Sequence, residues 1–315
     1  MSPKRKVKWI LTSGLGNQLY GYFAGQYVAQ RLNLKVQYVH NPPSKKQEQF
    51  KSNIRSFVLA NPVKRAKTHI FFPSILRRIF FGIKRRNDLV SRLHNFLIRN
   101  YSESAFEIEA EIKGIESALE NHRNRVIHVE GYFQDFSFYM GLRNRVALEL
   151  RNQSEWYLNL INRIRLIEPI VVHLRLGDYV NQSNIWGVLD TKYYEESLTR
   201  IRLDFPDNEI WVFSDNFRRA KKLLTGIKEF DFNFIDSSSD QDPAEVLSIM
   251  SKGVAHVVSN STFSLWAAII SNESKLVVVP NPFFKNVVNQ ARQLPSSWVK
   301  VSASWADDVV INSLV

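Results

Sequence analysis

The chain of 315 residues contains no cysteine. It therefore has no disulfide framework and no thiolate chemistry. It also lacks any apolar run that approaches the roughly 20 residues of a membrane-spanning helix. The N-terminus is basic, but its apolar run is short and ends before Gly14, so we expect neither a signal peptide nor a membrane anchor. These absences predict a cytoplasmic protein.

The composition is that of a globular protein, because 44% of the residues are hydrophobic. A chain of this length can bury a large core, and we expect two domains, residues 1–150 and 151–315. The periodicity of residues 143–165 predicts a helix that links them, and we expect further helices within the less regular region 44–125.

Short apolar segments alternate with helix-like segments. Residues 7–11 predict a strand that a glycine-containing turn and a helical pattern follow. Further strands are expected at 34–39, 126–129, 170–174, 209–213, 232–235, 254–258 and 275–279, the last one stopped by Pro280. We expect Asp190 or Thr191, and then Asp242, to cap helices. This alternation is typical of α/β proteins with parallel sheets.

The net charge of +12 requires a partner or a reason. Residues 71–99 mix arginines and lysines with bulky apolar residues, which favours contact with an anionic membrane surface. The alternative is an ordinary amphipathic helix with a solvated basic face. Nucleic acid is a less suitable partner, because the sequence has no zinc-ligand spacing, no RNP-like strand and no clear helix-turn-helix.

Charged side chains follow the buried strand near residue 172. His173, Arg175, Gly177 and Asp178 come directly after it. Ligands of α/β sheets bind outside the carboxyl ends of the strands, so this cluster is a candidate site. Arg175 suits bidentate binding of phosphate. The alternative is a structural strand end in which Arg175 pairs with Asp178.

The turn at residues 260–262 lies between a predicted strand and a helix. Backbone N–H groups and the hydroxyls of Ser261 and Thr262 can hold phosphate oxygens there, with help from the helix dipole. Simple N-capping is the alternative. Asp215 follows another strand, and it too has the alternative of belonging to a capped helix start.

Five segments, taken in order, resemble the motifs of the α1,2-fucosyltransferases, glycosyltransferase family 11. They are GLGNQL (14–19), GYFQ (131–134), HLRLGDY (173–179), FSD (213–215) and SNSTFSLWAA (259–268). The HLRLGDY segment and the Asn-Ser-Thr-Phe-Ser run are the most diagnostic.

The resemblance implies a GT-B-type fold, in which two facing Rossmann-like α/β domains enclose a cleft. Residues 1–150 would form the acceptor-side domain, and residues 151–315 would bind GDP-fucose. The implied reaction is an inverting transfer of L-fucose from GDP-β-L-fucose to a galactoside-like sugar, at O2 of a galactose residue, without a metal or other cofactor. With a cytoplasmic location, this predicts a role in assembly of a surface polysaccharide such as O-antigen. The basic segment would then rest on the inner leaflet, where lipid-linked acceptors lie.

The resemblance also implies residue roles. Arg175 would neutralise charge on the departing phosphate, and His173 would contact the nucleotide sugar or orient Arg175. The other donor contacts would come from Gly16, Asn17, Asp215, Ser261, Thr262 and Phe263, with Asp215 toward the guanosine and Asn17 toward the fucose and the acceptor. Asp178 and Glu130 are candidates for the general base, although Asp178 also suits a pairing with Arg175.

One departure from the family pattern bears on the donor. The family commonly has a second arginine where this chain has Leu176. A glycosyltransferase that uses another nucleotide sugar is therefore an alternative. A non-enzymatic protein that binds membrane or nucleic acid is a more distant one.

Overall fold

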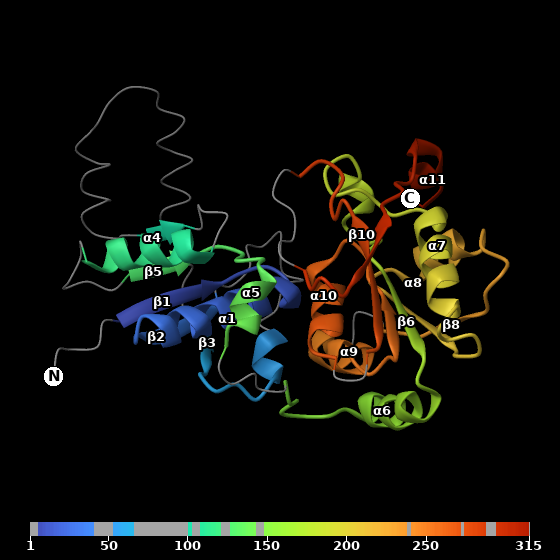
Figure 1. The fold of residues 1–315 in the computed structure, drawn as a ribbon. Coiled ribbons are helices and arrows are strands. Elements are labelled where there is room, and N and C mark those ends of the chain that lie inside the picture. The colour runs from blue at the N-terminus through green and yellow to red at the C-terminus, as the bar shows by residue number, and fades with distance from the viewer. Residues whose placement is uncertain are drawn as a thin grey trace. The chain divides into compact units, whose positions relative to one another are not determined.

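The computed structural model describes residues 6–40, 53–65, 100–102, 108–120, 127–142, 148–237, 241–271, 274–287 and 294–314 (Figure 1). The chain divides into two compact α/β units. The N-terminal unit comprises Met1–Arg55 and Leu59–Val146, and the C-terminal unit comprises Ser56–Val58 and Ala147–Val315. Each unit contains one sheet, and every strand pair in both sheets is parallel.

The N-terminal unit has a five-stranded sheet in the order β3-β2-β1-β5-β4. Helix α1 packs against β1 and β2, and α4 packs against β4 and β5. The elements are β1 (Lys6–Leu11), α1 (Leu15–Arg31), β2 (Lys35–His40), η2 (Asn53–Ser56, which ends in the other unit), β3 (Val63–Arg65), β4 (Asn100–Ser102), α4 (Ile108–Glu120), β5 (Ile127–Glu130) and α5 (Phe136–Met140).

A close approach between α1 and the sheet depends on Gly25. A Cβ atom at this position would lie 2.7 Å from Cε1 of Tyr38 and 3.0 Å from Cδ2 of Trp9. Both aromatic side chains are fully buried. Only glycine allows the helix to lie this near the large side chains that fill the layer beneath it.

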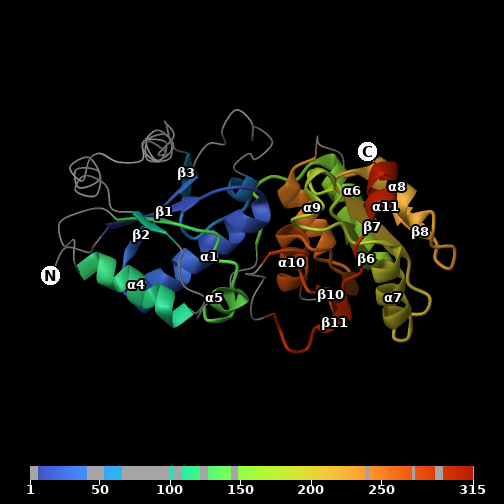
Figure 2. The same cartoon turned by 90° about the horizontal axis from the view of Figure 1, so that it is seen from above.

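The C-terminal unit has a six-stranded sheet in the order β11-β10-β9-β6-β7-β8. Helices α9 and α10 lie on one face of this sheet, and α7, α8 and α11 lie on the other (Figures 1 and 2). The elements are α6 (Glu155–Ile167), β6 (Ile170–Leu174), η3 (Val180–Gln182), α7 (Thr191–Arg202), β7 (Ile210–Ser214), α8 (Phe217–Leu224), β8 (Phe232–Phe234), α9 (Pro243–Met250), β9 (Ala255–Val257), α10 (Thr262–Ile269), β10 (Leu276–Asn281), β11 (Val299–Ser302) and α11 (Asp308–Leu314).

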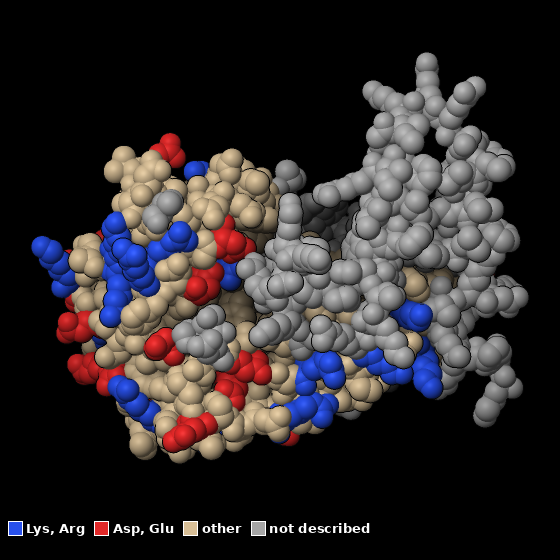
Figure 3. Space-filling view, turned by 180° about the vertical axis from the view of Figure 1, so that it is seen from behind, with Lys and Arg blue, Asp and Glu red and all other residues tan. Residues whose placement is uncertain are grey.

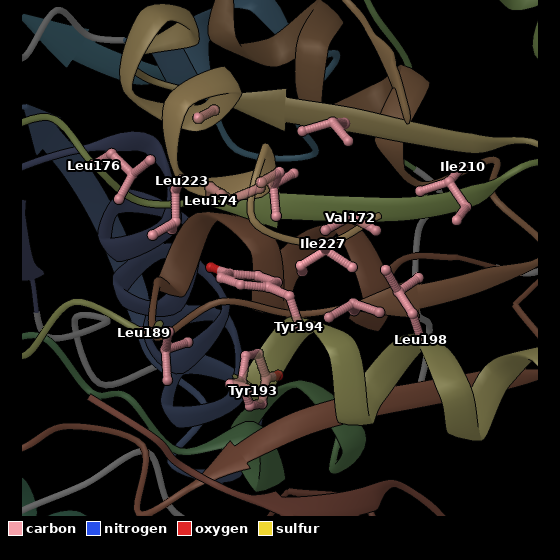
Figure 4. Close-up of a cluster of buried hydrophobic side chains, with 14 of the residues drawn as sticks. Val172, Leu174, Leu176, Leu189, Tyr193, Tyr194, Leu198, Ile210, Leu223 and Ile227 are labelled. Carbon is pink, nitrogen blue, oxygen red and sulfur yellow. The ribbon is translucent and has the colours of Figure 1, made fainter. Parts of the chain in front are cut away.

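The alternation of side chains along β6 sorts its residues between the two faces. Val172 and Leu174 join Leu198, Leu223 and Leu176 in the core under α7 and α8 (Figure 4). His173 is offset by one residue, and its ring lies 5.8 Å from that of Phe263 in α10. The strand is therefore buried on both faces, and the face opposite Val172 and Leu174 turns its histidine toward α10.

The expected helix caps are confirmed. Asp190 accepts a hydrogen bond from the backbone N–H of Tyr193 at the start of α7. Asp242 accepts one from Ala244 at the start of α9, where Pro243 occupies the first turn. Each carboxylate satisfies an N–H that has no partner within its helix.

Two sequence-based expectations were wrong. The strand near 275–279 does not stop at Pro280, because β10 runs to Asn281 and Pro280 pairs with Val301 of β11. Strand β9 pairs with β10 only as far as Val278. At Pro280 the strand β10 therefore pairs on one side only, where a residue without a backbone N–H is tolerated. Of the helix expected over 143–165, residues 143–147 lie outside the described residues and residues 148–154 are not helical. Helix α6 begins at Glu155, where the Ser154 side chain caps it by accepting from Tyr157.

The irregular region 44–125 contains α4 as expected, but also the short strands β3 and β4, which were not predicted. The basic segment 71–99 lies outside the described residues. Over the C-terminal unit, basic and acidic side chains are interspersed on the face that Figure 3 shows. In the part of the chain that the structure describes, no helix is both long and apolar enough to span a membrane.

The core of the C-terminal unit provides a test of the fold. Leu198 in α7 is fully buried, whereas Leu203, one residue beyond the helix, is 70% exposed. We expect Leu198→Ala to lower the free energy of unfolding by about 2–5 kcal/mol through lost burial and a cavity. Leu203→Ala should change it by less than about 0.5 kcal/mol. Equal losses for the two variants in urea unfolding would contradict this packing.

Candidate active site

The candidate site of the C-terminal unit begins where β6 ends. Arg175 follows the strand, and its guanidinium contacts two carboxylates. Its Nη2 lies 2.6 Å from Oδ1 of Asp178, and its Nη1 lies 2.9 Å from Oδ2 of Asp215. The guanidinium also lies over the ring of Tyr179, 5.3 Å from its centroid. The expected pairing of Arg175 with Asp178 is therefore present, and a second carboxylate joins it.

Asp215 also holds the loop that carries Arg175. Its Oδ1 accepts hydrogen bonds from the backbone N–H groups of Leu176 at 2.7 Å and Gly177 at 3.0 Å. A Cβ atom on Gly177 would lie 2.5 Å from Oδ2 of Asp215, so a side chain there would displace the carboxylate. From α8, Arg219 donates to the carbonyl oxygens of Leu176 and Gly177 at 2.8 and 2.9 Å. The loop is thus fixed through both its N–H and its C=O groups.

The two carboxylates stabilise the positive charge of Arg175. Burial by itself would lower the pKa of Arg175, but Asp215 and then Asp178 outweigh burial and raise this pKa. The side chain is still 24% exposed. A guanidinium has five N–H donors, so donors remain for a further anionic ligand beside the two carboxylates.

His173 is buried and electrically neutral. It is 4% exposed, and its Nδ1 lies 2.7 Å from Oγ of Ser259. Burial, and next the charge of Arg175, lower the pKa of His173 to about 3. A ring with this pKa is too weak a base to take a proton efficiently near neutral pH. We therefore expect His173 to orient a neighbouring group or to form a hydrogen bond, and not to act as the general base.

A chain of hydroxyl groups connects His173 to the first turn of α10. Oγ of Ser259 lies 3.2 Å from Oγ of Ser264, which donates to the carbonyl oxygen of Ser261 at 3.1 Å. Ser261 caps the helix by accepting from the N–H of Phe263 at 3.3 Å. The capping alternative is therefore correct for the Ser261 side chain, and the cap fixes the α10 N-terminus relative to the end of β6.

The remaining candidates lie at other strand ends. Thr262 is the first residue of α10, and Phe263 follows it. Gly16 and Asn17 lie in the first turn of α1, in the N-terminal unit. Oδ1 of Asn17 accepts a hydrogen bond from Nε2 of Gln134 at 2.8 Å. Glu130 ends β5 in the same unit.

The structure thus brings His173, Arg175, Asp178, Asp215 and the start of α10 together at the carboxyl edge of one sheet. Sequence reasoning missed Arg219, Ser259, Ser264 and the bond of Gln134 to Asn17, although three of these lie within the quoted motifs. Leu176 carries no charge, and its side chain is buried in the core of the C-terminal unit (Figure 4).

Possible metal ligands are dispersed in the described part of the chain, where no group of three or more His, Asp or Glu side chains could hold a metal ion. The sequence contains one Asp-x-Asp spacing, Asp240-Gln241-Asp242. Asp242 caps α9 and accepts a hydrogen bond from Ser56, while Asp240 lies outside the described residues. Asp242 therefore has a structural role.

Comparisons with known proteins agree with the motif pattern. The family model described as Glycosyl transferase family 11 matches residues 9–301. An alpha-1,2-colitosyltransferase of Escherichia coli is 24% identical over 92% of this chain and 97% of its own length. The O-antigen biosynthesis glycosyltransferase WbnK of Escherichia coli is 29% identical over 54% of this chain, and the galactoside 2-alpha-L-fucosyltransferase SEC1 of Bos taurus is 25% identical over 56%. These last two alignments span 59% and 52% of the relatives' lengths.

Solved structures show more distant likenesses. POFUT1 in complex with GDP-fucose aligns with a TM-score of 0.47 and 13% identity, covering 96% of this chain and 99% of that one. A family 9 glycosyl transferase from Veillonella parvula aligns with a TM-score of 0.48 and 11% identity, covering 96% of this chain and 87% of that one.

The buried His173 predicts a pH dependence of stability. Because the pKa of His173 is lowered from 6.5 to about 3, the folded protein binds fewer protons there than the unfolded chain at intermediate pH. Its contribution to stability is complete above pH 6.5 and declines as the pH falls. Relative to His173→Gln, wild type should lose about 2–3 kcal/mol between about pH 7 and about pH 4.5. Urea unfolding at each pH measures this difference, and a constant difference would contradict the lowered pKa.

The contacts of Asp215 predict a graded loss of stability. Asp215→Ala removes the acceptor of two backbone N–H groups and of Arg175, and it should lower the free energy of unfolding by about 1–3 kcal/mol. Asp215→Asn keeps an oxygen acceptor, so its free energy of unfolding should fall by less than that of Asp215→Ala. Asp207→Ala, at an exposed aspartate, is the matched control. If Asp215→Ala and Asp207→Ala unfold at the same urea concentration, Asp215 does not hold this loop.

Proposed function

Because the chain belongs to glycosyl transferase family 11, we propose that it transfers L-fucose from GDP-β-L-fucose, with inversion, to O2 of a galactose residue on a glycan acceptor. The product would be part of a bacterial surface polysaccharide such as O-antigen. The observation that carries the proposal is Arg175, held between two carboxylates at the end of β6, on the sheet edge where α10 begins. A guanidinium suits a diphosphate leaving group, because it can donate two parallel hydrogen bonds to phosphate oxygens.

We assign the donor to the C-terminal unit. Arg175 would hold the phosphates together with the backbone N–H groups at the start of α10, where the helix dipole favours negative charge. The hydroxyl chain from His173 to Ser264 supports this assignment, because it links the two phosphate-binding elements. Asp215 is already bonded to Arg175 and to the loop, so we assign it to positioning Arg175 instead of to the guanosine.

The proposed reaction forms one bond and breaks one bond. The acceptor oxygen attacks C1 of fucose while the bond from C1 to the phosphate oxygen breaks, and GDP leaves with that electron pair. Arg175 would stabilise the negative charge that grows on the β-phosphate, which lowers the barrier because the charge is larger in the transition state than in the bound donor. The acceptor proton must pass to a general base, and Asp178 and Glu130 remain the candidates.

The acceptor belongs in this proposal to the N-terminal unit, which carries Asn17. The proposal has four further parts. They are the facing arrangement of a GT-B enzyme, the contact of residues 71–99 with an anionic membrane, a cytoplasmic location and a lipid-linked acceptor. Each of them stays a prediction.

A colitosyl donor is the second candidate. The relative that aligns over 92% of this chain is an alpha-1,2-colitosyltransferase. Colitose differs from fucose by the loss of one ring hydroxyl, a change that leaves the proposed diphosphate contacts untouched. When the two GDP-sugars compete as donors, the ratio of their kcat/KM values shows which of them the enzyme prefers.

Nucleotide binding tests the donor site. GDP should raise the melting temperature of the wild-type protein by binding only the folded state, and UDP should not. EDTA should leave the shift unchanged. Arg175→Ala should abolish most of the GDP shift, since a charge-assisted contact contributes about 1.5–3 kcal/mol, or more than about tenfold in affinity.

Arg200→Ala, which removes an exposed arginine of α7, is the matched control and should retain the wild-type shift. A larger shift with UDP than with GDP would refute the guanosine donor. An unchanged GDP shift in Arg175→Ala would refute the assigned role of Arg175.

A further inference from the structure

We propose that Tyr132 and the amide pair of Asn17 and Gln134 form a subsite for a neutral sugar ring in the N-terminal unit. The subsite deepens the proposed function, on which it rests, because it would hold the galactoside acceptor. The geometry points to it through two half-buried amides and an exposed aromatic ring that lies on the Gln134 segment and next to the turn before α1, a combination that suits carbohydrate.

The sheet topology brings these residues together from distant parts of the chain. Strands β1 and β5 are parallel neighbours, with Ile10 opposite Glu130. Asn17 belongs to the helix that follows β1, and Tyr132 and Gln134 follow β5. The residues therefore meet at the carboxyl edge of the sheet, where ligands of α/β proteins bind. The bond from Gln134 Nε2 to Asn17 Oδ1, at 2.8 Å, joins segments 117 residues apart.

The amide pair leaves both a donor and an acceptor for a ligand. With one hydrogen bond between them, the Asn17 amide keeps its Nδ2 and the Gln134 amide keeps its Oε1. If the oxygen and nitrogen of both amides exchange places, one donor and one acceptor still remain. A sugar hydroxyl both donates and accepts, so neighbouring hydroxyls on one ring match this pair.

Tyr132 provides an apolar surface on the segment that carries Gln134. Its side chain is 49% exposed, whereas the adjacent Phe133 is 1% exposed and packs against Trp9 with ring centroids 4.9 Å apart. The buried ring of Phe133 anchors the segment that presents Tyr132. Oγ of Ser13 lies 3.5 Å from the Tyr132 hydroxyl group, which places the tyrosine next to the turn before α1.

The backbone on both sides of the subsite is held in an uncommon conformation. Ser13 has φ of 62° and Phe133 has φ of 49°, values in the left-handed region that non-glycine residues rarely adopt. The buried Gln18 side chain holds the first turn by donating to the carbonyl oxygen of Ser13 at 2.7 Å. Both turns are thus fixed before a ligand arrives, which reduces the entropy lost on binding.

The charge of these segments decides the class of ligand. Residues 12–18 and 130–134 contain no Lys or Arg. These two segments therefore supply no cation for a phosphate group, whereas Arg175 supplies one in the C-terminal unit. The subsite therefore fits the neutral acceptor rather than the nucleotide.

Acceptor kinetics with a β-galactoside, at saturating donor, test the subsite. We expect Tyr132→Ala to raise the acceptor KM about tenfold, as the loss of one aromatic contact predicts. Gln134→Leu should raise it about three- to tenfold through the loss of one hydrogen bond. Tyr132→Phe retains the ring and should stay within about twofold of wild type. The GDP-induced melting shift should persist in all three variants.

Met140→Ala is the matched control, because Met140 lies in the same unit and is 43% exposed. An acceptor KM for Tyr132→Ala equal to that of Met140→Ala would overturn the subsite. A melting transition in each variant close to that of wild type shows that the variants fold.

Saturation-transfer NMR with methyl β-D-galactopyranoside separates the subsite from the proposed function. A signal with wild type that is lost in Tyr132→Ala supports the subsite even if GDP fails to bind, in which case only the donor assignment fails. No signal with wild type, or an equal signal with Tyr132→Ala, overturns the subsite while the GDP shift still decides the donor.

Discussion

The ion pairs of Arg175 organise the candidate site. The guanidinium of Arg175 follows an apolar, buried strand, so it requires counter-charges close by. Asp178 and Asp215 supply these counter-charges, and the bonds of Asp215 to the N–H groups of Leu176 and Gly177 fix the loop that carries Arg175. Because the same carboxylate binds the side chain and the backbone, the direction of the guanidinium is coupled to the shape of the loop. Gly177 is required for this arrangement, since any Cβ atom would meet that carboxylate.

The two units offer different chemistry at their sheet edges. The C-terminal unit offers a guanidinium, a neutral buried histidine and a helix N-terminus, which together suit an anionic leaving group. The N-terminal unit offers two amides and an exposed tyrosine, in segments without a cation. The proposed division of labour follows from this contrast, since a nucleotide sugar carries its charge on the diphosphate and a glycan acceptor is neutral.

The sequence predicted regular elements best where burial on both sides of a strand made its apolar run continuous, as in β6 and β7. It failed at Pro280, because the effect of a proline in a strand depends on how many neighbours that strand has at that point. It also failed before α6, where helical periodicity continues but Ser154 caps the helix and bonds Glu245. In both places a contact from elsewhere in the chain overrode the local pattern.

By itself, the sequence determined the family, the alternation of strands and helices, and the choice of Arg175 and His173 as candidate site residues, because these depend on residue type and order along the chain. Only the tertiary structure decided what each side chain contacts. It paired Asp215 with Arg175, buried Leu176 in the core and joined Asn17 to Gln134, because parallel strands bring distant residues to one sheet edge. Pairings of that kind depend on strand order, which the local sequence does not specify.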